Sequence, residues 1–316
     1  MRQRSLAKLQ HVGGASIAAF SFLWLASITG GLAHAQTSEA NARGAISLGN
    51  RGWSASDANR ATPPANELEF SARAGFASDY IYRGTTLSDR GPAAGAAFEA
   101  RFGALYAGTT VATVKLPTQP VAEFTMTGGI RPKIAGIDFD LGVTYFAYPG
   151  ERLPGETNGI NYWEAIIRGD RSIGESIRVA AGYAYSPNVS NTGAWSQYAA
   201  AGVGYDVPGR LLPQNLGISF SAATGYFWFG NQAPLLGGFP LPAYLNWHAG
   251  VTFTHKVFNL DLRYYDTNLS RENCFVFTGD PNAQPGGRAN PVTNPDGLVS
   301  RWCGATFVAK AWVAFN

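Results

Sequence analysis

The feature that most constrains this chain is a period-two alternation of apolar and polar residues. In residues 68–76, Leu, Phe, Ala, Ala and Phe alternate with Glu, Ser, Arg and Gly. Successive side chains of a β-strand point to opposite faces, so this pattern predicts a strand with one apolar and one polar face. Twelve such strand-like runs are predicted, at residues 68–82, 94–102, 105–114, 121–133, 137–147, 161–171, 176–186, 195–206, 216–229, 244–255, 258–267 and 305–315.

The connections between these runs alternate in length. Tight links at 103–104, 134–136, 172–175 and 256–257, and a longer one at 207–215, alternate with mostly broader stretches at 83–93, 115–120, 148–160, 187–194, 230–243 and 268–304. Outer-membrane barrels combine short periplasmic turns with longer external loops. The chain is therefore predicted to be all-β, a transmembrane antiparallel up-and-down β-barrel of about twelve strands.

The composition agrees with such a barrel. Charged residues make up 14% of the chain and aromatic residues 13%, and there are 38 Gly, whereas soluble proteins carry about 25% charged residues. No segment after residue 35 holds eighteen successive apolar residues, so a helical membrane span is not expected there. A secreted β-sandwich outside the membrane is the alternative fold.

The N-terminal residues predict export. Arg2, Arg4 and Lys8 precede a short apolar stretch, and Ala33-His34-Ala35 is a typical cleavage site. We expect residues 1–35 to be a cleaved signal peptide, with a retained membrane anchor as the alternative. Residues 36–67 are polar and predict a flexible periplasmic arm, or alternatively a plug, and residues 68–316 form the barrel.

The charge balance argues against nucleic acid as a partner. Residues 1–35 contain three of the 24 basic residues and none of the 21 acidic ones, so the mature chain carries 21 of each sign. A chain with zero net charge has no chain-wide basic surface for a polyanion.

One stretch resembles a known family. Residues 78–84 read SDYIYRG, and LSDRGPAAGAAFEARF and LYAG follow. In this order they resemble the opening hairpins of the TorF family, bacterial outer-membrane proteins grouped with porins, and the match is best over residues 75–114. The resemblance implies a bacterial outer-membrane porin. Its expected partners are outer-membrane lipid and lipopolysaccharide, small solutes, and the barrel-assembly machinery during biogenesis.

Aromatic residues gather at the strand ends beside the long connections. Tyr and Trp favour the headgroup zone, so this clustering predicts an interfacial aromatic girdle; the alternative is the general preference of aromatic residues for strands. The predicted girdle residues are Tyr80, Tyr82, Tyr145, Tyr148, Tyr162, Trp163, Tyr183, Tyr185, Trp195, Tyr226, Trp228, Tyr244, Trp247 and Tyr264.

Charged residues fall on the opposite, polar face of the runs. Facing lipid, each would cost up to about 2–4 kcal/mol, so they are expected to line the lumen. Small residues on that face favour an open pore, and a narrow lumen closed by ion pairs is the alternative. The predicted lumen residues are Asp79, Arg83, Glu99, Arg101, Glu123, Arg131, Asp138, Asp140, Glu164, Arg168, Arg178, His248, Asp261 and Arg263, with Asp79 and Arg83 at the pore mouth or, alternatively, Arg83 merely ending its strand.

Enzymatic chemistry has little support in the sequence. Some outer-membrane barrels hydrolyse lipids with a Ser–His pair, but beyond residue 35 only His248 and His255 occur, and no G-x-S-x-G, H-E-x-x-H or phosphate-loop motif is present. We expect His248 to be a lumen residue and the protein not to be an enzyme, and we predict neither cofactor nor metal.

The two cysteines, Cys274 and Cys303, lie in the longest connection. In an exported chain they are expected to form a disulfide that closes the base of this loop. The chain-entropy estimate for a loop of this size is about 3–4 kcal/mol of stabilisation.

Overall fold

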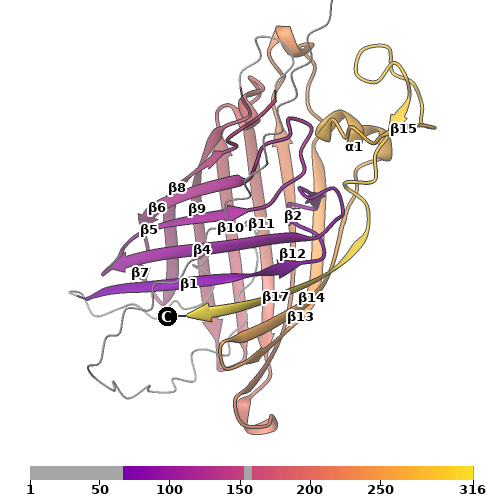
Figure 1. Cartoon of the computed structure of the whole chain (residues 1–316). Helices are drawn as coiled ribbons and strands as arrows, with labels where there is room; N and C mark the ends of the chain where they lie inside the picture. Colours follow the sequence, from indigo (N-terminus) through magenta and orange to yellow (C-terminus); the bar gives the residue numbers. More distant parts are fainter. Residues whose placement is uncertain (1–66, 153–158, 316) are drawn as a thin grey trace, which may run out of the picture. The chain divides into compact units, whose positions relative to one another are not determined.

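Twelve long antiparallel strands close into a barrel in the computed structural model, which describes residues 67–152 and 159–315 (Figure 1). Consecutive long strands pair with each other, and β1 pairs with β17 to complete the ring, so the predicted fold class is confirmed. The strands are β1 (Leu68–Ala77), β4 (Ala93–Phe102), β5 (Leu105–Ala112), β6 (Glu123–Ile130), β8 (Ile137–Ala147), β9 (Tyr162–Ile173), β10 (Ile177–Ser186), β11 (Ser196–Asp206), β12 (Leu216–Phe229), β13 (Tyr244–His255), β14 (Phe258–Thr267) and β17 (Thr306–Phe315).

The alternation in the sequence becomes an apolar outer wall and a polar interior. Along β13, Asn246, His248 and Thr252 are buried, whereas Ala249 between them is exposed. Large apolar side chains are exposed on the outer face, among them Phe70, Phe98, Ile167, Val203, Phe220, Phe258 and Leu262. This outer wall is what a barrel surrounded by lipid requires. Among the described residues, no helix is both long and apolar enough to cross a membrane.

The connections differ in length at the two ends of the barrel. At one end, here called the short-turn end, residues 103–104, 135–136, 174–176 and 256–257 join neighbouring strands, and the longer link at 207–215 contains the 3-10 helix η4 (Gly209–Leu211). Ala135 and Gly136 both have positive φ, 52° and 77°, as the two-residue turns of hairpins require. The broader connections lie at the other end, here called the long-loop end.

Two predicted strands differ from the observed ones. The run at 121–133 is interrupted at Pro132, whose missing N–H cannot join the ladder, and the pairing with β8 resumes in β7 (Lys133–Ile134). The first strand ends at Ala77 and not at Tyr82. After Ala77 the chain folds inward and forms a separate small hairpin of β2 (Ile81–Tyr82) and β3 (Thr85–Thr86).

The connection between β14 and β17 is the longest in the described part of the chain. It contains α1 (Arg271–Thr278) and a hairpin of β15 (Gln284–Pro285) and β16 (Leu298–Val299), and Figure 1 shows α1 beyond the strand ends. The hydroxyl of Ser270 caps α1 by accepting a hydrogen bond from the Asn273 amide. Cys274 and Cys303 form the predicted disulfide. Two other long connections hold η3 (Val189–Asn191) and η5 (Pro234–Leu236).

The predicted signal peptide at 1–35 lies outside the described residues, as does all but Glu67 of the predicted arm at 36–67. Both remain predictions.

Candidate functional site

The connection from β1 to β4 folds inward, and residues 78–92 are called the infolded segment below. Residues 79–86 are all buried. The tip of the β2–β3 hairpin is Arg83-Gly84, with φ of 49° and 83°. Two consecutive left-handed residues are typical of a type I′ turn, and Gly is the usual choice at its second position. The Tyr-Arg-Gly-Thr sequence is therefore a tight turn that places Arg83 at the tip of the hairpin.

Hydrogen bonds within the infolded segment hold its two limbs together. Oδ1 of Asp79 accepts hydrogen bonds from the hydroxyls of Thr86 and Ser88, at 2.5 and 3.0 Å. The amide of Tyr80 donates to Ser88 Oγ, and the amide of Leu87 donates to the Tyr80 carbonyl. Burial raises the pKa of the Asp79 carboxyl above its ordinary value, while the two hydroxyl donors oppose this shift. The segment is thus a compact unit built around one buried acid.

Arg83 forms the central contact between this unit and the barrel wall. Its guanidinium donates two hydrogen bonds of 2.8 Å to Glu164 of β9, and each side chain of the pair is 3% exposed. The guanidinium carbon lies 4.7, 4.2 and 4.6 Å from the ring centroids of Tyr82, Tyr198 and Phe227. Bidentate pairing and stacking on aromatic faces are the interactions for which Arg is suited.

A second acid in the wall accepts hydrogen bonds from two tyrosine hydroxyls. Glu123 of β6 is 1% exposed and accepts hydrogen bonds from the hydroxyls of Tyr80 and Tyr148, at 2.8 and 2.9 Å. The hydroxyl of Tyr82 donates to Glu164 at 3.2 Å. The infolded segment therefore meets two acids of the wall, Glu123 and Glu164, through Tyr80, Tyr82 and Arg83.

These contacts correct the predicted aromatic girdle for five residues. Tyr80, Tyr82, Tyr148, Tyr162 and Tyr244 are buried in the barrel and do not face outward. The first two lie on the infolded hairpin and not on a spanning strand. Tyr162 and Tyr244 lie at inward positions of β9 and β13, on the same faces as the buried Glu164 and Asn246.

The remaining aromatic residues of the predicted girdle lie on the outward positions. Tyr145, Trp163, Tyr183, Tyr185, Trp195 and Trp228 are exposed, and Tyr226, Trp247 and Tyr264 are half-buried. All are near the long-loop end of the barrel. Their role in a membrane interface stays a prediction.

The long connection that holds α1 covers the infolded segment. Phe277 of α1 packs against the rings of Phe229 and Tyr244, with centroids 5.2 and 5.3 Å apart. The indole of Trp302, next to the disulfide, donates to Asp89, and the guanidinium of Arg90 donates to the carbonyls of Arg301 and Ala305. The disulfide-closed loop and the infolded segment thus form one packed cap.

A second polar cluster lies near the short-turn end. Arg131 donates two hydrogen bonds to Glu99, at 2.6 and 2.9 Å, and a third to Asp140 at 3.3 Å. Asp140 also accepts from the hydroxyl of Tyr106, whose ring lies 3.6 Å from the Arg131 guanidinium carbon. Tyr106 was not among the predicted lumen residues, although the period-two pattern of β5 places it on the inward face.

A third cluster lies along β12, β13 and β14. Arg263 pairs with Asp261 through two hydrogen bonds of 3.0 and 2.8 Å, and it also bonds to Nδ1 of His248 and to the hydroxyl of Ser221. Because an arginine guanidinium is always a donor, His248 accepts through Nδ1 in this contact. The guanidinium contacts both Ser221 and His248, so this arrangement gives no support to a Ser–His hydrolase.

The predicted lumen residues all lie on or toward the interior. Those that are buried are Asp79, Arg83, Glu99, Arg101, Glu123, Arg131, Asp140, Glu164, His248, Asp261 and Arg263, and those that are half-buried are Asp138, Arg168 and Arg178. Arg178 pairs with Asp206 at 3.5 Å, and Asp138 with the exposed Lys133.

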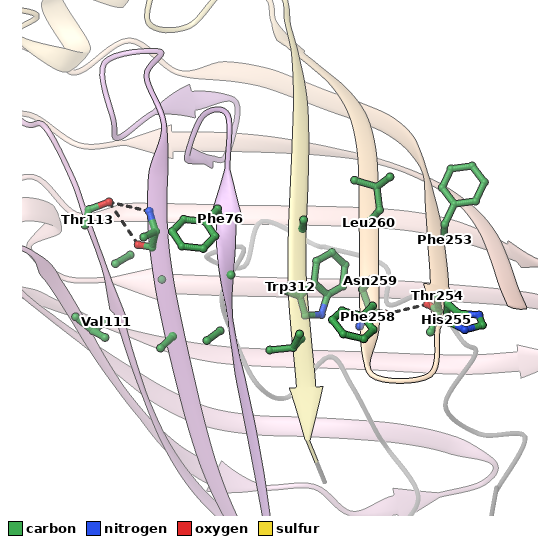
Figure 2. Close-up of a pocket in the computed structure, with 18 of the residues that line it drawn as sticks. Phe76, Val111, Thr113, Phe253, Thr254, His255, Phe258, Asn259, Leu260 and Trp312 are labelled. Carbon is green, nitrogen blue, oxygen red and sulfur yellow. Dashed lines mark hydrogen bonds between the residues drawn. The ribbon is translucent and has the colours of Figure 1, made fainter. Parts of the chain in front are cut away.

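A cavity of about 800 Å³ lies elsewhere, along β5, β4, β1, β17, β14 and β13 (Figure 2). Its lining is mostly apolar and includes the outward-facing Phe76, Val111, Phe258 and Leu260. No residue of the infolded segment lines it. The cavity therefore belongs mainly to the outer wall, and the charged interior is the better candidate for a functional site.

These features define a class: a closed twelve-stranded β-barrel with an apolar outer wall, a charged interior and a connection that folds inward. A family model described as a bacterial protein of unknown function (Gcw_chp) matches residues 61–285. The chain belongs to this family. No curated protein matches it.

Among solved structures, the chain is similar to the NanC porin at 10% identity, covering 78% of this chain and 100% of that one with a TM-score of 0.43. It is similar to the KdgM porin at 8% identity, covering 78% and 99%, with the same TM-score. LpxR from Salmonella typhimurium has 9% identity, 78% and 99% coverage and a TM-score of 0.36. At these values we base the fold on the strand pairing and draw no function from the similarities.

Proposed function

We propose that the protein is a bacterial outer-membrane porin that forms a small passive channel for small hydrophilic solutes. The long-loop end faces outward, and the resemblance of residues 75–114 to the TorF family supports the same proposal. Export through a cleaved signal peptide, insertion by the barrel-assembly machinery, and contact with outer-membrane lipid and lipopolysaccharide follow from it.

The observation that carries the proposal is the character of the interior along β10 and β11. Ala180, Gly182, Ala200 and Gly202 lie at inward positions and are only half-buried. Small side chains leave space inside a barrel of this size, whereas larger ones fill it. Arg168 lies inward and half-buried on the neighbouring β9, so the space is bordered by charge. Such a lining suits water and small polar solutes.

Planar-bilayer recording of pure refolded protein tests the proposal. We expect discrete conductance steps, and we expect Arg168→Glu to shift the ion preference toward cations because it reverses a charge beside the passage. Phe220→Leu, which changes an exposed outward residue, should leave both unchanged. Folded protein that gives no conductance steps would refute the channel.

A second candidate is a closed-lumen barrel with a structural or surface-interaction role. It is favoured by the burial of the Arg83–Glu164 pair at the long-loop end and by Glu123, which is 1% exposed. Such a barrel would insert into membranes, unfold cooperatively and conduct no ions. The same recordings therefore separate the two candidates.

A further inference from the structure

We propose that the infolded segment is the gate of this channel, that the structure shows its closed state, and that the Arg83–Glu164 pair is the latch. The inference rests on the proposed channel function and names its regulation. Three properties of the segment's β2–β3 hairpin support it: bonds within residues 79–88 hold the hairpin together, the hairpin lies outside the barrel ladder, and its hydrogen bonds to the wall involve Tyr80, Tyr82 and Arg83.

The segment can move as one unit because its limbs are joined to each other. The β2–β3 pairing and the hydroxyl bonds of Thr86 and Ser88 to Asp79 all lie within residues 79–88. Displacing the hairpin from the wall breaks none of them. The hairpin would therefore keep its own fold on leaving the interior, and only its bonds to its surroundings would break, among them the bond from the Thr86 amide to the Trp302 carbonyl.

The barrel ladder does not depend on the hairpin. The pairing of β1 with β4 reaches Ala77 opposite Ala93, and the pairing of β1 with β17 reaches Ala77 opposite Lys310. The hairpin begins beyond these pairs. Since the ring is complete without it, the wall can stay closed while the segment moves.

The contacts between hairpin and wall converge on a few groups. Arg83 holds Glu164 with two bonds of 2.8 Å, the hydroxyls of Tyr80 and Tyr82 bond to Glu123 and Glu164, and the Tyr244 hydroxyl bonds to the Arg83 carbonyl. From the covering connection, the Trp302 carbonyl accepts a hydrogen bond from the Thr86 amide. Of these, only the Arg83–Glu164 pair joins two opposite charges. Without Glu164 the guanidinium would keep its aromatic neighbours but lose its anionic partner in a buried site, which strongly disfavours the inward position.

Three variants test whether the Arg83–Glu164 ion pair holds the segment closed. Glu164→Gln leaves Arg83 buried without its anion and should raise the open probability at least tenfold. Arg83→Met with Glu164→Met replaces the ion pair by two apolar side chains of related length, so the infolded segment should again favour the closed state. Lys133→Gln breaks an exposed ion pair with Asp138 at the short-turn end and should leave gating unchanged.

An engineered disulfide tests the movement itself. A Cβ at Gly84 would lie 3.0 Å from the Cβ of Asn246, shorter than the roughly 3.5–4.5 Å found in disulfides, so the tip must move back slightly to form the bond; it would also lie 2.4 Å from Thr267 Cγ2. Gly84→Cys and Asn246→Cys, with Thr267→Ser to remove that methyl group, should therefore lock the tip to β13. The matched control carries Asn246→Cys and Thr267→Ser alone and receives the same reducing agent, since the native disulfide is present in both.

If the segment is a gate, the open probability of the oxidised, locked protein should be at most a tenth of that of the reduced protein. In the control variant, reduction should not raise the open probability. Equal conductance of locked and reduced protein, in channels that do conduct, would overturn the gate and leave the porin intact. A further variant replaces residues 80–88 by a short Gly/Ser turn. If this variant is folded by heat-modified gel mobility and still gives no conductance, the proposed channel fails and the gate with it.

Discussion

The ion-pair cluster of Arg131 gives the sharpest prediction on stability. Glu99 and Asp140 are buried, and three hydrogen bonds from the Arg131 guanidinium hold them. Arg131→Met removes the guanidinium that hydrogen-bonds to both acids. Removing one partner of a buried pair typically costs about 3–5 kcal/mol. We expect the unfolding free energy to fall by that amount.

Reversible urea unfolding of the refolded barrel in lipid vesicles, followed by tryptophan fluorescence, measures this change. Arg131→Lys keeps the charge but loses the bidentate geometry, so it should cost less, about 1.5–3 kcal/mol for hydrogen bonds to charged groups. Lys133→Gln disrupts a solvent-exposed pair and should cost at most about 1 kcal/mol. A loss of less than 1 kcal/mol in Arg131→Met would show that the cluster does not stabilise the barrel as argued.

Three further predictions concern the infolded segment and its cover. Tyr148→Phe removes a hydrogen bond to the buried Glu123 and should lower the unfolding free energy by about 1.5–3 kcal/mol, whereas the outward Tyr145→Phe should change it by no more than about 0.5 kcal/mol in the same urea assay. Because the pKa of Asp79 is raised, its ionisation opposes folding as pH rises from 3.8 through the folded-state pKa. Asp79→Asn should therefore melt at a higher temperature than the wild type at neutral pH, and at the same temperature below pH 3.8. A difference in melting temperature that does not change with pH would contradict this. Cys274→Ser with Cys303→Ser should speed proteolysis within residues 279–300 while the barrel core stays protected, and unchanged cleavage would show that the disulfide does not restrain the loop.

The strands could be read from the sequence because lipid on one side and a polar interior on the other impose a strict period of two. The same period of two led to a wrong end for the first strand, which was predicted to reach residue 82. Tyr80 and Tyr82 continue the alternation of β1, but they do so because the β2–β3 hairpin is itself extended. Only the left-handed turn at Arg83-Gly84 signals the reversal, and Arg-Gly is a weaker turn signal than Asn-Gly.

The inward direction of some aromatic side chains could have been predicted from the sequence. Tyr162 and Trp163 are adjacent on β9, so the two cannot both face lipid. The girdle prediction considered only how near each aromatic residue lies to a strand end, and not which face of the strand its side chain occupies. The pairing of Arg83 with Glu164 was not accessible, because the partners lie 81 residues apart and their meeting depends on the infolding and on the stagger of the barrel.

Cysteine accessibility on β11 tests the central claim, a hydrated interior, most directly. Ala199 and Ala200 are neighbours, both half-buried, with Ala199 outward and Ala200 inward. Each single cysteine variant has one free thiol, because the two native cysteines are bonded to each other. In protein refolded into lipid vesicles, Ala200→Cys should react with a charged methanethiosulfonate reagent and lose conductance, while Ala199→Cys should do neither. Failure of Ala200→Cys to react would contradict the account.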